Sequence, residues 1–269
     1  MSTVFNAYAS YYNLLYQDKD YAAEVDYIDR LLVRHGLAGR DLLEFGSGTG
    51  RHGRLLASRG YRVTGIERSP EMIAQAAVTD GFRCQAGDIR TVRLGQRFDA
   101  VLALFHVISY QVTNADVRAT LASAAEHLTP GGLFVFDVWY SPAVYAKKPD
   151  VRIKRLTGNG VEITRIAEPE LYPNENRVDV RYTFFVGEAG SGVYQTFTEI
   201  HSMRHFSLPE LDGLAAEAGF APVCAEEFLT GAAPSESTWG VCLVWRKNSI
   251  MSDSSLQRSA DLEPGRQPD

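Results

Sequence analysis

The segment from Asp41 to Gly50, with the sequence DLLEFGSGTG, constrains the fold of this chain more than any other. A short apolar run containing the acid Glu44 gives way to alternating glycines, and helix-forming sequence follows. Glycine at alternate positions lets the backbone turn sharply and removes the side chains that would keep a ligand away. A loop of this kind, between a strand and the start of a helix, is suited to binding a nucleoside-containing cofactor.

A second strand predicted after this loop, Tyr61–Glu67, also ends in an acid. In open α/β sheets, an acidic residue at this position accepts hydrogen bonds from the ribose hydroxyls of a bound nucleoside. Glu67 is therefore the first candidate for a cofactor-binding side chain.

Strands and helices alternate through the first half of the chain. Phe98–Phe105 is almost continuously apolar, as expected for a central parallel strand that is buried on both faces. The sequence predicts helices over 51–59, from Pro70 to about Val78, and over 115–128, the last stopped by Pro130-Gly131-Gly132. The predicted strands are 42–45, 61–67, 82–87, 98–105 and 133–139. This alternation favours a doubly wound parallel sheet.

The pattern changes after Trp139. Four runs with a period of two predict an antiparallel β meander inserted into the α/β domain, over residues 151–156, 161–166, 178–186 and 193–203. A helix then begins near Ser207 and ends at Gly219, and two final strands, 222–229 and 239–246, complete a seven-stranded, mostly parallel α/β sheet. The expected organisation is an N-terminal helical lid (1–36), a core (37–142 and 207–247), an inserted antiparallel β subdomain (143–206) and a disordered tail (248–269).

Composition excludes several classes of protein. The 269 residues are 45% hydrophobic and 22% charged, which is typical of a soluble globular chain, and the formal charge of −6 gives no reason to expect a nucleic-acid partner. The three cysteines form no disulfide framework, and no His/Cys group has zinc-ligand spacing. No secretory signal or membrane-spanning segment is visible, so the chain is expected to be cytoplasmic.

Four motifs lie at the ends of the predicted strands: Glu44-x-Gly46-x-Gly48-x-Gly50, Glu67, Gly87-Asp88-Ile89 and Pro130-Gly-Gly132. Together they resemble class I S-adenosylmethionine-dependent methyltransferases, which have a Rossmann-like fold, and the resemblance covers roughly residues 40–140. Glu44 replaces the commoner aspartate of that family, and Ser47 stands where many members have cysteine.

The resemblance implies S-adenosyl-L-methionine as cofactor and gives roles to particular residues. Gly46 and Gly48 would let the loop approach the methionine part and the ribose, with Glu44 near the amino group. Asp88 would accept from the adenine amino group. The full set of cofactor-binding residues implied in this way is Tyr16, Glu44, Gly46, Gly48, Glu67, Arg68, Met72, Asp88, Ile89 and Leu104.

A narrower resemblance involves the N-terminal aromatic segment ending at Tyr16, the stretch Asp20–Glu24, and Asp137-Val-Trp-Tyr140 before the β-rich insert. These features are similar to methyltransferases that act on the amino group of nucleotide-linked deoxyaminosugars. The resemblance implies a small-molecule acceptor of the nucleotide-sugar kind and a homodimer. Substrate contacts are then expected from Tyr12, Trp139 and Tyr140.

His106 follows the fourth strand and is the histidine placed best in the sequence to accept a proton from an amine or to orient it, although a structural role is equally compatible with its position. His201 and His205 lie four residues apart on one predicted strand, but no third ligand is evident, so no metal is expected.

Other functions remain open at this point. An O-methyltransferase acting on a sugar or a secondary metabolite would have the same motifs. Gly48–Gly53 also matches the dinucleotide pattern GxGxxG, which would suit a nicotinamide-dependent oxidoreductase, although no hydride-transfer residues accompany it. A non-catalytic cofactor-binding protein is the remaining alternative. The sequence does not identify the acceptor, the methylated atom or the number of transfers.

Overall fold

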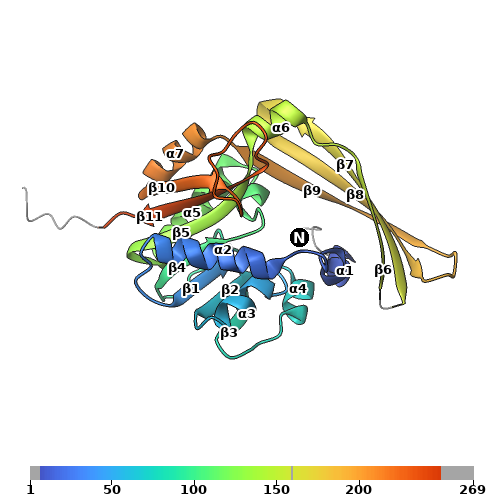
Figure 1. Ribbon diagram of the computed structural model, residues 1–269, viewed down its shortest axis with the longest axis horizontal. Helices are drawn as coiled ribbons and strands as arrows, with labels where there is room; N and C mark the ends of the chain where they lie inside the picture. The colour runs from blue at the N-terminus through green and yellow to red at the C-terminus, as the bar shows by residue number, and fades with distance from the viewer. Residues whose placement is uncertain (1–6, 159, 250–269) are drawn as a thin grey trace, which may run out of the picture.

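A computed structural model describes residues 7–158 and 160–249. It consists of an α/β body and a long antiparallel β arm that extends away from it (Figure 1). Residues 250–269, most of the expected tail, lie outside the described residues, as do residues 1–6 of the expected lid.

The α/β body is built on seven strands in the order β3-β2-β1-β4-β5-β11-β10. The first five are parallel, whereas β11 runs antiparallel to β5 and β10 antiparallel to β11. This confirms the expected doubly wound, mostly parallel sheet. The strands are β1 (Asp41–Phe45), β2 (Arg62–Glu67), β3 (Phe82–Ala86), β4 (Phe98–Ala103), β5 (Leu128–Tyr140), β10 (Phe220–Glu227) and β11 (Gly240–Lys247).

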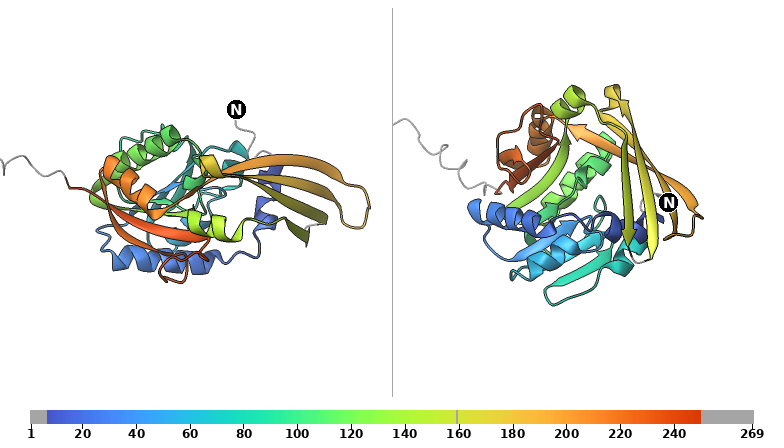
Figure 2. Two further views of the ribbon diagram at one scale, coloured as in Figure 1. Left: turned by 90° about the horizontal axis from the view of Figure 1, so that it is seen from above. Right: turned by 45° about the vertical axis from the view of Figure 1, so that its right-hand side comes forward.

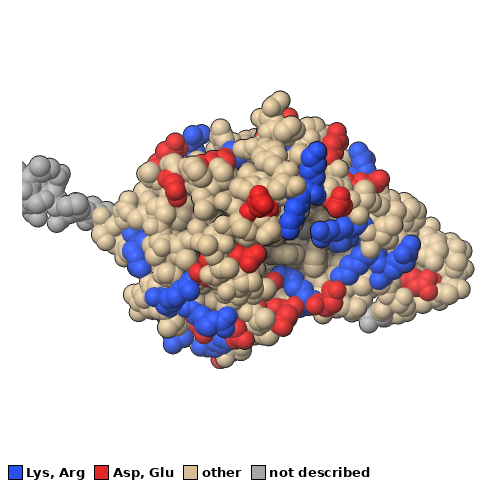
Figure 3. Space-filling view, turned by 45° about the horizontal axis from the view of Figure 1, so that its top comes forward, with Lys and Arg blue, Asp and Glu red and all other residues tan. Residues whose placement is uncertain are grey.

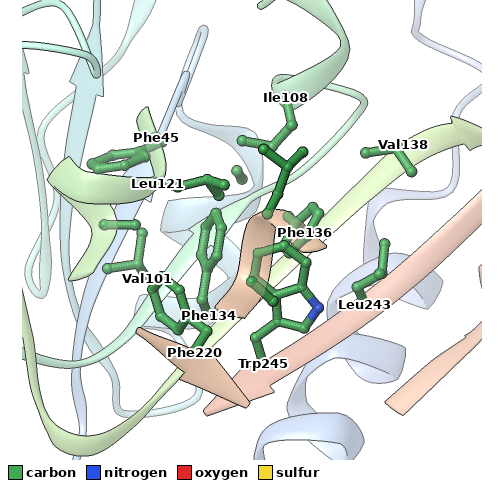
Figure 4. Packing of buried hydrophobic residues seen from close by; sticks show 14 of the residues in the cluster. Phe45, Val101, Ile108, Leu121, Phe134, Phe136, Val138, Phe220, Leu243 and Trp245 are labelled. Atoms are coloured by element: carbon green, nitrogen blue, oxygen red, sulfur yellow. The ribbon is translucent and has the colours of Figure 1, made fainter. Parts of the chain in front are cut away.

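Helices cover both faces of this sheet (Figure 2). On one face, apolar side chains of α2 (Tyr21–Arg34) and α3 (Arg51–Ala57) pack in one core cluster. On the other face, α5 (Asn114–His127) and α7 (Leu208–Glu217) pack in a second cluster. The second cluster is rich in aromatic rings, with Phe136 stacked 4.6 Å from Phe134 and edge-on, at 4.7 Å, to Trp245 (Figure 4). Such ring pairs contribute beyond the area that they bury.

The predicted meander is present as four antiparallel strands: β6 (Arg152–Gly158), β7 (Val161–Tyr172), β8 (Arg177–Glu188) and β9 (Gln195–Phe206). It is not a separate sheet, because the end of β9 pairs in parallel with the end of β5 through His205↔Trp139 and Phe206↔Tyr140. Its strands are also longer than the alternating runs. Glu168-Pro169-Glu170 breaks the alternation, yet its backbone continues the ladder with β8.

Two local predictions were wrong, and one helix was not predicted. Pro130-Gly131-Gly132 does not separate helix from strand, since β5 already begins at Leu128, which is paired with Phe98. Helix α4 (Pro70–Gln75) ends before Val78. Residues 141–147, for which no helix was predicted, form α6 (Ser141–Lys147), with Pro142 in its first turn, where proline is favourable. Two short 3-10 helices complete the fold: η1 (Ile108–Tyr110) and η2 (Pro173–Glu175).

The N-terminal helix α1 (Ala7–Leu15) joins the two parts of the molecule. Leu15 is buried in an apolar cluster with Ile163 and Phe184 of the meander. On the side of the body, the Asn13 amide donates to Gln75 Oε1 (3.0 Å) and accepts from Thr49 Oγ1 (3.1 Å). Helix α1 therefore contacts both the α/β body and the arm.

The aromatic cluster generates a stability prediction. Replacing Phe136, which is 0% exposed, with alanine leaves a cavity among Phe134 and Trp245, so we expect Phe136→Ala to lower the free energy of unfolding by about 3–5 kcal/mol. Val33→Ala, at a position 69% exposed, is the control and should change it by less than about 0.5 kcal/mol. Urea denaturation measures both, and equal small effects would contradict the packing described for the core.

Candidate functional site

A cavity of about 1040 Å³ lies at the carboxyl ends of β1, β2, β3 and β4 and extends to the inner face of the meander. Figure 3 shows the surface hollowed between body and arm, with Lys and Arg side chains gathered on the arm side of the hollow. Sites for one small molecule usually measure about 300–1,000 Å³. This cavity therefore has room for a nucleoside cofactor and a second ligand.

Most of the residues predicted from the sequence meet in the wall of this cavity. They are Tyr12, Tyr16, Gly46, Gly48, Glu67, Arg68, Met72, Asp88, Ile89, Leu104, His106 and Trp139.

The glycine loop has the backbone geometry that its sequence predicted. Gly46, Gly48 and Gly50 all have positive φ, at 65°, 55° and 73°. A Cβ at Gly46 would lie 2.6 Å from Cγ2 of Val107, whereas one at Gly48 would have no atom within 4 Å. Since Gly48 lines the cavity, the space beside it belongs to the cavity and is available to a ligand.

The Glu67 carboxylate is bound by backbone amides. Its Oε2 accepts from the N–H of Gly48 (2.9 Å), and its Oε1 accepts from the N–H groups of Arg68 and Ser69 (2.8 Å each). A carboxylate offers about four lone-pair sites, so it can accept a hydroxyl in addition. These hydrogen bonds fix the acid of β2 and the glycine loop relative to each other.

Asp88 is less available than the sequence suggested. Its Oδ2 accepts from Nη2 of Arg90 (2.6 Å), and its Oδ1 accepts from the backbone and Nε of the same residue (2.9 Å each). The hydrogen bonds from Arg90 hold the pKa of the Asp88 carboxyl below its usual value. Asp88 is thus ionised and oriented, and a ligand amino group would share it with Arg90.

Two predicted residues do not lie in the wall. Glu44, only 2% exposed, is behind the glycine loop, where burial and the nearby Glu67 raise its pKa to about 8. That position does not support the expected contact of its side chain with the amino group of a cofactor. Tyr140 packs against the aromatic core cluster instead, because successive residues of a strand face opposite ways and Trp139 takes the cavity side.

His106 and the residue before it have a strained backbone. Phe105 and His106 have φ of 66° and 63°, a left-handed conformation that is uncommon for residues other than glycine. Such conformations persist where the surrounding structure imposes them, and they cluster at functional sites. Nothing in the sequence pattern indicates this geometry.

Asp137 in β5 is the partner of His106, a role that the sequence analysis missed. Its Oδ2 lies 2.7 Å from Nδ1 of His106 and accepts from the His106 backbone N–H (3.1 Å). Asp137 is 1% exposed, and although burial opposes ionisation, His106 lowers the pKa of this carboxyl below its usual value. An acid inside the apolar strand LFVFDVW was the available signal, since buried acids require a partner.

The meander adds wall residues that the sequence did not predict for this site, although His201 was considered there as a metal ligand. Arg152, Arg165, Tyr182 and His201 line the cavity together with Tyr110 of η1. Nδ1 of His201 lies 2.9 Å from the hydroxyl of Tyr110. The period-two pattern of the meander strands would have placed the four meander residues on one face of the sheet. It would not have shown which face meets the cavity.

His205, considered with His201 as a metal ligand, has a different environment. It is 0% exposed, and its Nδ1 lies 2.8 Å from the hydroxyl of Ser141. Within residues 7–158 and 160–249, no group of three or more His, Cys, Asp or Glu side chains is arranged to bind a metal ion. Over the same ranges, no helix combines the length and apolar character needed to cross a membrane.

Comparison with known proteins gives consistent matches. Residues 42–132 match the family model described as a methyltransferase domain. The chain is 32% identical to the dTDP-3-amino-3,4,6-trideoxy-alpha-D-glucopyranose N,N-dimethyltransferase of Streptomyces venezuelae, over 79% of this chain and 89% of that protein. It is 30% identical to the dTDP-4-amino-2,3,4,6-tetradeoxy-D-glucose N,N-dimethyltransferase of Saccharopolyspora spinosa, over 80% and 83%.

Among solved structures, the chain is similar to S-adenosylmethionine-bound CalS10, an amino pentose methyltransferase from Micromonospora echinaspora involved in calicheamicin biosynthesis. The TM-score is 0.71 and the sequence identity 26%, and the match covers 92% of this chain and 99% of that one. The match extends over body and arm, so the two chains share the whole architecture.

The environment of His205 generates a prediction about pH. Burial lowers the pKa of His205 to about 4, below the value of about 6.5 in an unfolded chain. As pH falls from 6.5 to 4, the unfolded chain therefore takes up the proton first, and stability decreases by about 1 kcal/mol per pH unit. Urea denaturation at pH 7, 6 and 5 should show a shallower decrease for His205→Gln than for the unaltered protein, and equal slopes would be incompatible with a neutral buried His205.

Proposed function

Because this chain belongs to the S-adenosylmethionine-dependent methyltransferases, we propose that it methylates the amino group of a nucleotide-linked deoxyaminosugar. Membership of this family favours methyl transfer over the hydride transfer of a nicotinamide-dependent oxidoreductase, which the sequence had left open. The observation that supports a nucleotide-linked aminosugar as the acceptor is a cavity that connects the glycine loop to the inner face of the meander, where arginines lie.

The cofactor half of the cavity suits S-adenosylmethionine. Glu67 would accept from the ribose hydroxyls, Gly48 leaves open space beside the loop, and Asp88 presents an oriented carboxylate for the adenine amino group. Met72, Ile89 and Leu104 supply the apolar surface of the wall. When bound, the cofactor supplies a methyl group on a sulfonium sulfur. A lone pair of the acceptor attacks the methyl carbon, and the carbon–sulfur bond breaks to leave a thioether.

The meander half suits an acceptor with an anionic portion. Arg152 and Arg165 line it, and Nε of Arg165 is buried without a hydrogen-bond partner in the described part of the chain. A buried N–H of this kind is stabilised by an acceptor, and a guanidinium matches phosphate oxygens well. The relatives from Streptomyces venezuelae and Saccharopolyspora spinosa are named for dTDP-linked sugars, and a diphosphate would supply such oxygens here.

His106 and Asp137 form the pair proposed to act on the amino group. A protonated amine has no lone pair, so it must lose a proton before it attacks. The imidazole of His106 lines the cavity, and the buried carboxylate of Asp137, 2.7 Å from its Nδ1, stabilises the positive charge that the ring gains with that proton. His106 is therefore the proposed proton acceptor. A cytoplasmic location and a homodimer remain part of the proposal.

The acceptor is tested by incubating the protein with S-adenosylmethionine and a panel of dTDP-linked 3-amino and 4-amino deoxysugars. We expect products heavier by one or two methyl groups, located on nitrogen by mass spectrometry and NMR. Methylation on oxygen would favour the alternative of an O-methyltransferase, and transfer to none of these amino sugars would refute the proposed substrate class.

The role of Glu67 is tested by cofactor binding. Glu67→Gln removes the charged acceptor for the ribose hydroxyls, so calorimetry with S-adenosylhomocysteine should show the dissociation constant raised about tenfold or more, which corresponds to about 1.4 kcal/mol. Glu126→Gln, at an exposed residue paired with Arg93 on the surface, is the matched control and should bind normally. Equal affinities would exclude Glu67 from the cofactor site.

The role of His106 is tested by separating turnover from binding. We expect His106→Ala to lower kcat about 100-fold while the dissociation constant for S-adenosylhomocysteine changes by less than about threefold. A parallel loss of both would assign His106 a structural role instead.

A further inference from the structure

A second polar cluster lies on the meander side of the cavity and is not used by the function proposed above. It consists of Tyr110 in η1 and of His201 and Glu199 in β9. The Tyr110 hydroxyl lies 2.9 Å from Nδ1 of His201, and Nε2 of His201 lies 3.4 Å from Oε2 of Glu199. His201 is 2% exposed and Glu199 8%, while Tyr110 and His201 both line the cavity.

The chemistry of the three groups sets the direction of these hydrogen bonds. A carboxylate only accepts, so we assign the hydrogen that faces Glu199 to Nε2 of His201. In the neutral ring Nδ1 is then an acceptor, and the Tyr110 hydroxyl donates to it. Burial raises the pKa of Tyr110 well above its ordinary value, so this hydroxyl remains protonated.

The surroundings of Tyr110 favour a positively charged ligand group. Among the titratable groups around it, Tyr182 of β8, Tyr16 after α1, Glu199 of β9 and Glu67 of β2 all oppose negative charge at Tyr110, while Arg152 and Arg165 are cations on the meander side of the same cavity. His201 is also flanked by Tyr182, whose ring lies edge-on at 4.9 Å. The guanidinium of Arg165 lies 5.1 Å from the centre of the same Tyr182 ring. An ammonium group is stabilised beside Tyr110 by groups that oppose negative charge there.

We propose that Tyr110 contacts the nitrogen of the acceptor amino group and is a second proton acceptor beside His106: it takes the proton that the N-methylated ammonium loses after transfer and passes its own proton to His201, which Glu199 holds in the required tautomer. In this step an N–H bond of the ammonium breaks, its electron pair stays on nitrogen, and Tyr110 Oη takes the proton. The original Tyr110 proton moves to Nδ1 of His201, and the resulting imidazolium is stabilised by Glu199. Tyr110 is then a catalytic residue and His201 a positioning residue. The inference rests on an amine acceptor, as proposed above.

Steady-state kinetics with the best dTDP-aminosugar test this proposal. Tyr110→Phe keeps the ring and removes the hydroxyl, and it should lower kcat about 10- to 100-fold without changing the KM for S-adenosylmethionine more than twofold. Tyr145→Phe, at an exposed tyrosine of α6, is the matched control and should have full activity. His201→Gln should lower kcat similarly, and the double variant should be no slower than the slower single variant, because the two residues act as one unit.

Two further readouts separate a proton relay from a structural role. The acid limb of the pH profile of kcat should shift in His201→Gln, and long-range ¹H–¹⁵N NMR of the unaltered protein should find the His201 proton on Nε2, with signals that move in Tyr110→Phe. If the unaltered protein methylates no amino sugar, the proposed function and this inference both fail. If it is active but Tyr110→Phe retains full kcat, the losses multiply in the double variant, or His201 carries its proton on Nδ1, this inference alone is overturned.

Discussion

The carboxylate of Glu67 holds together the part of the cavity proposed to bind the cofactor. It ends β2 and accepts backbone N–H groups from the glycine loop after β1 and from the start of the segment that leads into α4. Hydrogen bonds to a charged acceptor are stronger than those between neutral groups, so this one side chain fixes two adjacent strand ends relative to each other. The same position is where an acid can meet the ribose hydroxyls of a nucleoside.

The arm depends on the body through the long strand β5. Its first part pairs with β4 and β11 in the core, and its last residues pair with β9 of the meander, so the arm continues the sheet. The inner face of the arm is thereby held opposite the carboxyl ends of the parallel strands. Helix α1 closes the same space from the other side through Asn13. The cavity is therefore a product of the topology as well as of its wall residues.

Much of the fold was predictable because local signals agreed. The structure confirms the types of element that three patterns predicted: the alternating glycines, the acids at strand ends, and the change from a helical to a period-two pattern. The predicted positions of strand ends were less accurate, as at Glu168-Pro169-Glu170. The backbone there continues to pair with the neighbouring strand although the alternating side-chain pattern has stopped. Proline and glycine at 130–132 gave the wrong boundary for the same reason.

The site was predictable only in its sequence-local parts. Gly46, Gly48, Glu67, Asp88 and His106 follow strands whose ends must converge, so their meeting could be anticipated. Asp137 as partner of His106, and His201 as partner of Tyr110, depend on contacts between residues far apart in the chain. Neither partnership has a local signature, and the left-handed backbone at Phe105 and His106 has none either.

A crystal structure of the protein with S-adenosylhomocysteine and dTDP tests the central claim most directly. We expect the ribose hydroxyls of the cofactor product on Glu67 and the diphosphate of dTDP beside Arg152 and Arg165, within one continuous cavity. A nucleoside bound away from Glu67, or dTDP bound outside the space enclosed by the meander, would contradict it.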